Sequence, residues 1–441
     1  MPSASPRPGG RIASVLVTTA IVLLLLIAAS IPVAASLGIL GLVLDRFYSA
    51  MPLHLALGEV TWQNAIEYVL AAIPLFILMG EIQLRSGVAE RMYGAMVQWL
   101  SWLPGGLMHS NIGACGFFAA TSGSSVATAA TIGTVAVPEA GRYGYNERLF
   151  LGTIAAGGTL GILIPPSINL IIYGLLTDTS VPRLYLAGFI PGLLLSLMFM
   201  LTIVAACLYR KSWGGSPVGT DWRKRFQSLP HMLPPLVLFI LVIGSIYAGV
   251  ATPTEAASLG VVGSLGLAAF MRSLSLAMLK EAVEGTMRTT AMVMLIILAA
   301  IFLNFVLAAI GLTHLLTDYI SALGLGPVGT IVVIVAFYLV LGCFMETFSM
   351  LLTTTPLVAP IVFAMGYDPV WWGIVLTVLL EAALITPPIG VNLYVVHGVR
   401  ERGSMNDVII GSLPFVLTMF IMVVLLIVFP QIALFLPEAF N

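Results

Sequence analysis

Two pairs of adjacent prolines interrupt apolar stretches that could otherwise form membrane helices. The first lies in GILIPPSIN, from Gly161 to Asn169, and the second in ITPPIGVN, from Ile385 to Asn392. Each pair removes two backbone donors and crowds the preceding turn, so nearby carbonyl groups lose their helical partners. Such carbonyls are costly in hydrocarbon unless they line a cavity or bind a cation. Joined by Ser, Thr and Asn side chains, they suit a hard monovalent ion such as sodium; a purely structural kink is the alternative.

Two further apolar stretches, 107–137 and 328–363, are interrupted by short polar segments, Thr121–Ser125 and Met345–Ser349. We interpret both as re-entrant hairpins whose polar tips turn inside the membrane. The first tip offers hydroxyl groups and flexible backbone. Close packing by small residues would explain the same composition.

Acidic residues are rare in the apolar stretches, and intramembrane carboxylates are functional candidates by default. Glu346 lies in the second hairpin, Glu381 six residues before Pro387, and Glu81 at the end of an early apolar run. Glu346 could take part in ion binding or gating, or could have a structural, hydrogen-bonded role. Glu81 is expected at the membrane interface beside Arg85.

The composition explains why these residues must be positioned by membrane helices. Of 441 residues, 59% are hydrophobic and 8% charged, against about 45–50% and about 25% in soluble domains. The net charge of -1 gives no basic surface for nucleic acid. The three cysteines lie in apolar stretches without a metal-binding pattern, so disulfides and structural zinc are not expected.

Apolar runs predict nine full crossings, and the interrupted stretches add the two hairpins. The crossings are expected near 12–44, 65–84, 149–174, 184–209, 232–250, 254–271, 289–311, 373–398 and 408–436. The first run could be misread as a signal peptide, but it is far longer than a signal-peptide core. With the N-terminus inside, sixteen basic residues are cytoplasmic and only Arg46 and Arg183 are external. We therefore expect the N-terminus in the cytoplasm and the C-terminus outside.

Three hydrophilic or amphipathic segments separate these spans. The stretch 210–231 contains five basic residues and reads as a cytoplasmic linker between two halves. The segments 88–102 and 273–288 mix charged and apolar residues at helical spacing. They suit helices lying at the interface, or alternatively ordinary loops.

The chain contains an internal repeat. The fixed shift that carries Pro138 onto Pro360 also carries Gly144-Tyr145 onto Gly366-Tyr367 and the first Pro–Pro pair onto the second. One extra residue then aligns Asn169 with Asn392. The loop 139–148 is basic and cytoplasmic, whereas 364–371 lacks Lys and Arg and is external, so the repeats are inverted. Inverted repeats with discontinuous helices are typical of secondary transporters.

At these motifs the chain resembles the large membrane subunit of the tripartite ATP-independent periplasmic (TRAP) transporters, over almost its whole length. The matching segments are Ile31–Ala34, Ile73–Phe76, Met79–Glu81, Ser86–Gly87, Leu103–Gly106, Ser122–Ser125, Ile164–Ser167, Ala187–Gly192, Thr252–Ala256 and Thr386–Asn392. The resemblance implies an all-α polytopic elevator-type transporter. It also implies sodium-driven uptake of organic acids, a periplasmic binding protein and a small four-helix membrane subunit on a separate polypeptide.

The resemblance also assigns roles to individual residues. One sodium site would use Ser122 and Ser125 with the carbonyl region of Gly161, Ile164 and Pro166. The related site would use Gly342, Met345 and Thr386, although Ala383 stands where the repeat would place a glycine. Substrate would lie between the tips, near Ser124, Ser167, Asn169, Glu346, Thr347 and Asn392. No catalytic residue or organic cofactor is implied.

The expected domains follow the repeats. They comprise scaffold helices in 1–106, a first transport repeat in 107–183, scaffold helices with the linker in 184–327, a second transport repeat in 328–404 and a scaffold helix in 405–441. The main alternative function is a sodium-coupled dicarboxylate carrier that needs no binding protein. An intramembrane enzyme is disfavoured because HExxH, paired-aspartate and GxSxG motifs are absent. A channel fits inverted hairpins less well than alternating access does.

Overall fold

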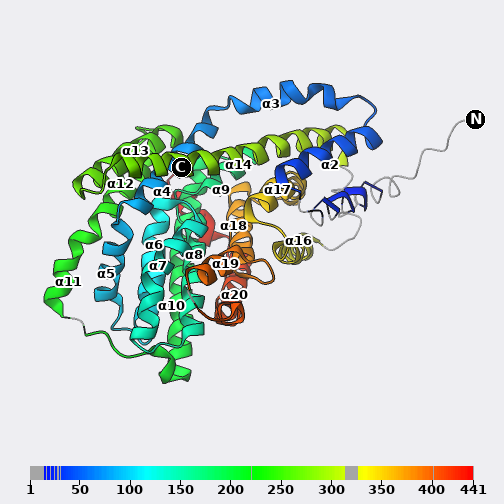
Figure 1. The fold of residues 1–441 in the computed structure, drawn as a ribbon. Helices are drawn as coiled ribbons and strands as arrows, with labels where there is room; N and C mark the ends of the chain where they lie inside the picture. The colour runs from blue at the N-terminus through cyan, green and yellow to red at the C-terminus, as the bar shows by residue number, and fades with distance from the viewer. Residues whose placement is uncertain are drawn as a thin grey trace, which may run out of the picture.

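The computed structural model describes residues 31–219, 221–312, 326–400 and 402–440, with 14–15, 17–19, 21–23, 25–26 and 29 near the N-terminus. Within these residues every regular element is a helix (Figure 1). Arg7, Arg11 and the first residues of the predicted crossing 12–44 lie outside them. The predicted all-α fold is therefore confirmed.

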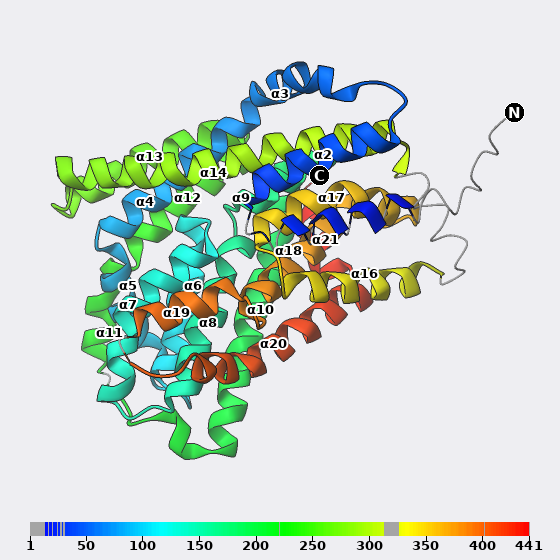
Figure 2. The ribbon, with the colours of Figure 1, turned by 45° about the vertical axis from the view of Figure 1, so that its right-hand side comes forward.

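One group of helices forms a layer across the top of the molecule, above the remaining helices (Figure 2). The long helix α14 packs against α2 and α4, and α4 packs against α13, which in turn contacts α12. The bounds in this layer are α2 Val33–Tyr48, η1 Leu53–Ala56, α3 Leu57–Ala65, η2 Tyr68–Ala71, α4 Ala72–Arg85, α12 Leu233–Tyr247, α13 Pro253–Phe270 and α14 Leu276–Ala309.

The two repeats form the body below this layer, and their helices match at the predicted shift. The first repeat contains α6 Leu107–Ser122, α7 Ser125–Arg142, α8 Glu147–Leu163 and α9 Ile168–Thr177; the second contains α16 Gly326–Gly342, α17 Thr347–Ala364, α18 Pro369–Ile385 and α19 Val391–Val399. Helix α8 is capped by Asn146 and α18 by Asp368, two positions that the shift superimposes. Both Pro–Pro pairs interrupt their helices, and α9 is bent by 43° from α8. The predicted broken helices are confirmed.

The two broken helices run in opposite directions, as two cross-repeat contacts show. Near the end of α9, the Tyr173 hydroxyl donates to the carbonyl of Pro369 at the start of α18, at 2.7 Å. At the end of α19, Arg400 Nε lies 2.8 Å from Glu147 Oε1 at the start of α8. Each broken helix therefore starts where the other ends, which confirms the predicted inversion.

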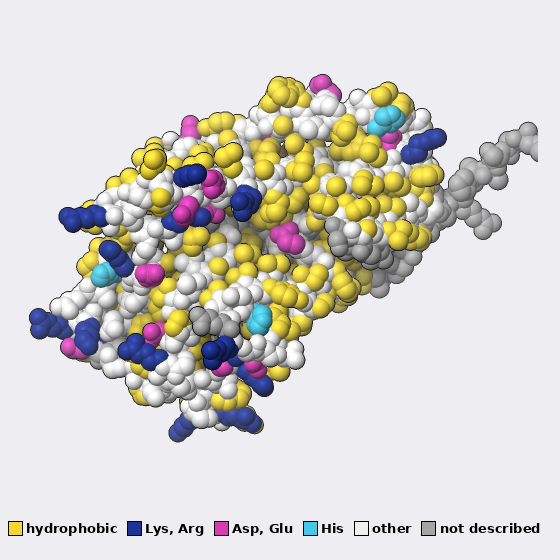
Figure 3. Space-filling model, viewed as in Figure 1, with side chains coloured by type: hydrophobic (Ala, Val, Ile, Leu, Met, Phe, Trp, Pro, Cys, Tyr) yellow, Lys and Arg dark blue, Asp and Glu magenta, His cyan; other side chains and the backbone are white. Residues whose placement is uncertain are grey.

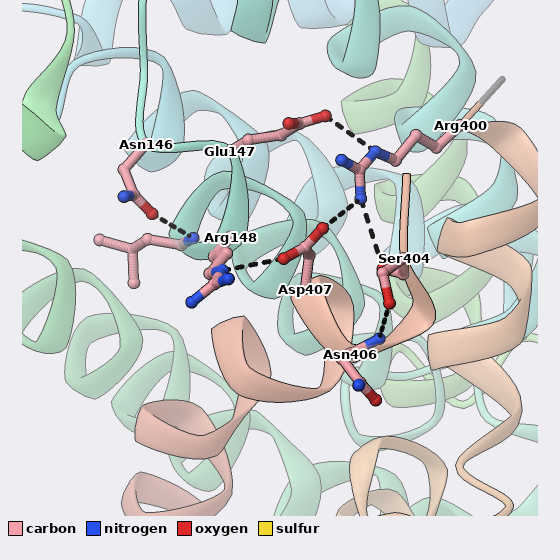
Figure 4. Close-up of polar contacts among 8 residues, drawn as sticks. Asn146, Glu147, Arg148, Arg400, Ser404, Asn406 and Asp407 are labelled. Atoms are coloured by element: carbon pink, nitrogen blue, oxygen red, sulfur yellow. Dashed lines mark hydrogen bonds and ion pairs between the residues drawn. The ribbon is translucent and has the colours of Figure 1, made fainter. Parts of the chain in front are cut away.

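Helix α20, Met405–Val428, joins both repeats. Asp407 in its first turn lies 2.8 Å from Arg148 Nε and 3.3 Å from Arg400 Nη1, and Figure 4 shows these side chains pointing toward one another. One turn further on, the backbone at Gly411 approaches α8 so closely that an added Cβ would meet the carbonyl of Arg148. At its other end, the Leu426 carbonyl accepts from Trp371 Nε1 of α18, at 2.8 Å.

Helix α10, Val181–Tyr209, shows what the exposed side of this body looks like. Its Leu193, Leu197 and Leu201 recur every four residues and are between half and two thirds exposed, whereas Leu195 and Phe199 are fully buried. In Figure 3 a broad hydrophobic area covers the visible face, and most Lys and Arg side chains lie toward its lower left. An apolar exposed face next to a charged end is what a bilayer requires.

Among the described residues, five helices are long and apolar enough to cross a membrane, or up to seven if two bent pairs each count as one span. The five are Tyr68–Arg85, Val181–Tyr209, Leu276–Ala309, Thr347–Ala364 and Met405–Val428. They overlap predicted crossings or, for Thr347–Ala364, the predicted second hairpin. The chain is thus built for multiple passages through a bilayer.

Two expected segments differ from the structure, and for a third the structure decides between helix and loop. The segment 273–288 is neither a loop nor a separate helix, because α14 runs unbroken from Leu276 into the crossing predicted at 289–311. The crossing predicted at 408–436 ends at Val428; Pro430, which lacks a backbone donor, precedes a separate helix α21, Gln431–Ala439. The alternative of a loop at 88–102 is wrong, because α5 occupies Val88–Leu100.

The predicted linker 210–231 contains short helices. They are η3 Lys211–Gly214, α11 Trp222–Ser228 and η4 Leu229–His231. Helix α11 packs on α5, since Phe226 meets the Trp99 ring edge-on at 6.3 Å and Arg225 Nε donates to the Gln98 carbonyl at 3.0 Å. The Phe226 ring and the Arg225 hydrogen bond thus attach this hydrophilic segment to α5.

Candidate functional site

The first hairpin turns at Gly123, whose φ of +61° is in the region that favours glycine. Ser124 then caps α7, accepting from the Ala127 amide at 3.3 Å. The Ser122 hydroxyl lies 2.9 Å from Thr128 Oγ1 across the turn. The tip thus places several hydroxyl oxygens and the N-terminus of a helix at one point.

The first helix break lies directly against this tip. A Cβ added at Gly161 would lie 2.7 Å from the Ser124 carbonyl and 2.8 Å from the Ser125 nitrogen. A Cβ at Gly123 would lie 3.0 Å from the Pro166 carbonyl oxygen. The structure therefore brings together Ser122, Ser125, Gly161 and Pro166, with Ile164 in the same break, which are the residues that the resemblance assigns to one sodium site.

The second tip has the same outline but different chemistry. Glu346 caps α17, accepting from the Ser349 amide at 3.2 Å. Gly342 on the hairpin packs against Ala383 on α18, where an added Cβ would lie 2.7 Å from the Ala383 Cβ. Thr386 donates to the Ala382 carbonyl at 2.7 Å. In the second repeat, a glycine on the hairpin thus allows a close approach to the broken helix at Ala383.

Both tips open onto one cavity of about 780 Å³. The first tip contributes Ser122 to Ala127 and the second contributes Glu346 to Ser349. The rest of the wall comes from α2, α4 and α14 of the upper layer, including Gly80, Glu81 and Thr289, and from the repeats themselves, including Ile162, Ile168 and Leu384. The cavity therefore lies between the paired tips and helices outside the repeats.

Five residues predicted near substrate or ion line this cavity: Ser122, Ser124, Ser125, Glu346 and Thr347. Thr347 is 2% exposed, and its hydroxyl group has no hydrogen-bond partner. A buried hydroxyl without a partner is costly, which makes it a candidate to bind a ligand.

The other three residues predicted near substrate are not among those that line the cavity. Ser167 caps α9 through the Leu170 amide. Asn392 donates to the Ala155 carbonyl at 3.2 Å, linking α19 to α8. Asn169 is buried, and neither side-chain atom has a partner. The structure thus gives Ser167 and Asn392 contacts within the protein.

Two features of the site were missed by sequence reasoning. Glu381 contacts the first tip, since its carboxylate oxygens each lie 3.1 Å from Ser125 Oγ. Glu81 lines the cavity as well as pairing with Arg85. The sequence singled out Glu381 as a carboxylate within an apolar segment. Its contact with the tip of the other repeat could not be predicted, because residue spacing within one repeat says nothing of contacts with the other.

The oxygen atoms at the tips fit the hard cation expected there. In the part of the chain that the structure describes, no group of three His, Cys, Asp or Glu side chains is placed to hold a metal ion. Ligands for sodium would come from Ser122, Ser125 and the carbonyl groups of the first break. In the second set, the Thr386 hydroxyl already donates its proton to the Ala382 carbonyl of its own helix.

Comparison with known proteins shows where this architecture occurs. A family described as "Tripartite ATP-independent periplasmic transporter, DctM component" matches residues 20–432. The C4-dicarboxylate TRAP transporter large permease protein DctM of Vibrio cholerae is 34% identical over 428 residues, covering 92% of this chain and 94% of that protein. The sialic acid TRAP transporter large permease protein SiaM of the same organism is 32% identical over 375 residues, covering 85% and 87%.

The fold is also similar to a solved structure, the YdaH transporter of Alcanivorax borkumensis. The TM-score is 0.66 at 16% identity, covering 93% of this chain and 98% of that one. The sequence matches establish that the chain belongs to the DctM family of TRAP transporter large permeases, which are membrane transporters and not enzymes.

Proposed function

We propose that this protein imports an organic acid bearing a carboxylate across the bacterial inner membrane, driven by sodium. The observation that carries the proposal is the convergence of both hairpin tips on one cavity, each tip packed against a broken helix. Exposed carbonyl and hydroxyl oxygens at such breaks are suited to a coupling ion. The DctM and SiaM relatives are named for acids, C4-dicarboxylate and sialic acid.

The two tips offer different binding environments. Helix α7 begins at the first tip, and its N-terminus favours an anionic group. The corresponding end of α17 is already capped by Glu346. A substrate carboxylate would therefore bind at Ser124 and Ser125, and the unpaired Thr347 hydroxyl is a candidate to orient the rest of the molecule.

We propose an elevator movement for translocation. The tips and broken helices would move as one body, comprising 107–183 and 328–404, against α2, α4 and α14. The cavity wall supports this division, because one side comes from the repeats and the other from the upper layer. Sodium, when bound, would supply positive charge that holds the tip oxygens together.

The partners follow from the tripartite family description. We propose a separate small membrane subunit and a periplasmic binding protein that delivers the substrate. The N-terminus would be cytoplasmic and the C-terminus periplasmic, as the distribution of basic residues favours.

The decisive experiment is uptake into proteoliposomes containing this chain and its small subunit. A panel of radiolabelled organic acids would be offered with an inward sodium gradient or an equal potassium gradient, with and without the purified binding protein. Uptake that needs both sodium and the binding protein supports the proposal. Uptake that needs sodium alone indicates the carrier without a binding protein, and uptake independent of sodium refutes the coupling.

Two variants test the ion sites within that assay. Replacing Pro166 or Thr386 with Ala should raise the sodium concentration for half-maximal uptake more than it lowers expression. The matched control is Thr134→Ala, because exposed Thr134 donates to a carbonyl four residues earlier, as Thr386 does. Unchanged sodium activation in both variants would count against the broken-helix sites.

A further inference from the structure

Glu381 is a carboxylate at the centre of the protein, 0% exposed, on helix α18 of the second repeat. Its side-chain hydrogen-bonding partner is Ser125, the first residue of α7 in the other repeat, whose hydroxyl lies 3.1 Å from each carboxylate oxygen. The same hydroxyl lies 3.3 Å from the Thr159 carbonyl on α8. Glu381 therefore contacts the first tip at the point where both broken helices meet it.

This environment leaves the carboxylate without a protein cation. The ion pairs formed by the described residues do not include Glu381. The Ser125 hydroxyl and the Ile162 backbone amide supply two donors, whereas a carboxylate offers about four acceptor positions. A buried carboxylate is costly unless a positive charge or several donors compensate it.

A positive charge is what the adjacent tip is proposed to bind. Ser125 belongs to the predicted sodium-ligand set, and Gly161 of the same set packs against the backbone of Ser124 and Ser125. We propose that the Glu381 carboxylate is the fixed counter-charge of the sodium ion bound at the first tip. This inference rests on the proposed sodium coupling and names the residue that balances the ion's charge.

The counter-charge would link the two repeats. The ion and its hydroxyl ligands belong to the first hairpin, but the balancing charge comes from the second repeat. At the equivalent place in the first repeat stands Thr159, and the residue equivalent to Ser125 is Thr347, whose hydroxyl has no partner. Among the described residues, only the first tip has a hydroxyl in contact with a buried carboxylate of the other repeat. Sodium should therefore bind more tightly at the first tip than at the second.

The test is sodium binding to the purified complex, measured as thermal stabilisation when sodium replaces potassium at constant ionic strength. Glu381→Gln keeps the shape of the side chain and removes its charge. It should raise the apparent sodium dissociation constant at least about tenfold, as expected for loss of an adjacent opposite charge. Glu381→Asp keeps the charge and should remain within about threefold of the wild type. Glu438→Gln, the same change on exposed α21, is the control and should match the wild type.

The outcomes separate this inference from the proposed function. No sodium-dependent stabilisation of the wild type would refute sodium coupling itself. Stabilisation of the wild type with an unchanged dissociation constant in Glu381→Gln would overturn the counter-charge alone, as would an equal loss in Glu381→Asp.

If the Gln variant does not fold, infrared difference spectra of the wild type and Glu381→Asp decide the question. Sodium should perturb a carboxylate stretching band in the wild type, and that band should move in the Asp variant. A sodium-sensitive band at the same position in both proteins, or no such band, would overturn the proposal.

Discussion

The two hairpin tips share a backbone plan and differ in charge. At the first tip Ser124 caps α7, whereas at the second the repeat-related Glu346 caps α17. The same relation replaces Thr159 by Glu381 on the broken helix. The two carboxylates that the repeats themselves place near the tips therefore both come from the second repeat. Duplication preserved the architecture, while substitution at equivalent positions gave each tip its own electrostatic environment.

Each hairpin packs closely against its broken helix through a glycine, but the glycine stands on a different helix in each repeat. In the first repeat the glycine is on the broken helix, where Gly161 accepts the backbone of the tip. In the second it is on the hairpin, where Gly342 accepts Ala383. Close contact between hairpin and broken helix is thus the retained feature, and the position of the glycine is free to change.

The largest effect is expected from Gly161→Ala, which would break the first tip. The new Cβ would lie 2.7 Å from backbone atoms of Ser124. Backbone atoms are harder to displace than the end of a flexible side chain. Overpacking of about 1–3 kcal/mol should lower sodium-driven uptake by roughly 10- to 100-fold. Gly141→Ala, on α7 with open space around it, is the control. Equal uptake by the two variants would show that the tip tolerates displacement.

The second tip offers a sharper test, because its contact can be removed and restored. Gly342→Ala should reduce uptake by about tenfold, since its Cβ would meet the Cβ of Ala383. Adding Ala383→Gly moves the glycine to the place it holds in the first repeat and should recover most of the uptake. Both single variants and the double variant would be compared in one proteoliposome assay. Failure of the double variant to recover would contradict the complementary packing.

A smaller effect, on stability rather than ion binding, is expected from Asp407→Asn. Asp407 pairs with Arg148 and with Arg400, which is 8% exposed. Losing both partly buried pairs should cost about 1–2 kcal/mol, between the values for exposed and buried pairs. The melting temperature of the complex should fall while the sodium dissociation constant stays the same. The exposed Lys280–Glu284 pair provides the control through Glu284→Gln, and a change in sodium affinity would link the ion pairs to the tips.

The smallest effect on transport is expected from replacing Arg223 and Lys224 with Glu. Both are exposed on α11, away from the residues that line the cavity. The positive-inside rule predicts effects on membrane orientation or assembly. Uptake per correctly inserted complex should stay within about twofold, with the same order of preferred acids. A new substrate preference would show that α11 influences the cavity.

Much of the fold could be predicted because its signals are local or periodic. Pro165-Pro166 and Pro387-Pro388 interrupt their helices because each pair removes two adjacent backbone donors and crowds the preceding turn. The fixed shift between the repeats predicted matching helix ends. Segment 273–288 could not be placed in the same way, because charged residues at helical spacing occur both in interfacial helices and in an extension of a neighbouring helix. Here they belong to α14.

The site was predictable only in part. Ser122 and Ser125 stand in a polar interruption and could be found by composition. Glu81 and Thr289 of the cavity wall come from α4 and α14, and nothing in their own segments indicates that they face the tips. Their place depends on how the upper layer packs on the repeats.

By itself, the sequence determined a polytopic membrane protein with a duplicated, inverted plan and two polar tips, because hydropathy, proline chemistry and repetition act along the chain. Only the tertiary structure decided that Glu381 lies against Ser125, 256 residues away, and that Gly342 packs against Ala383. These are contacts between separate elements. Their partners are selected by packing in three dimensions, which no local pattern records.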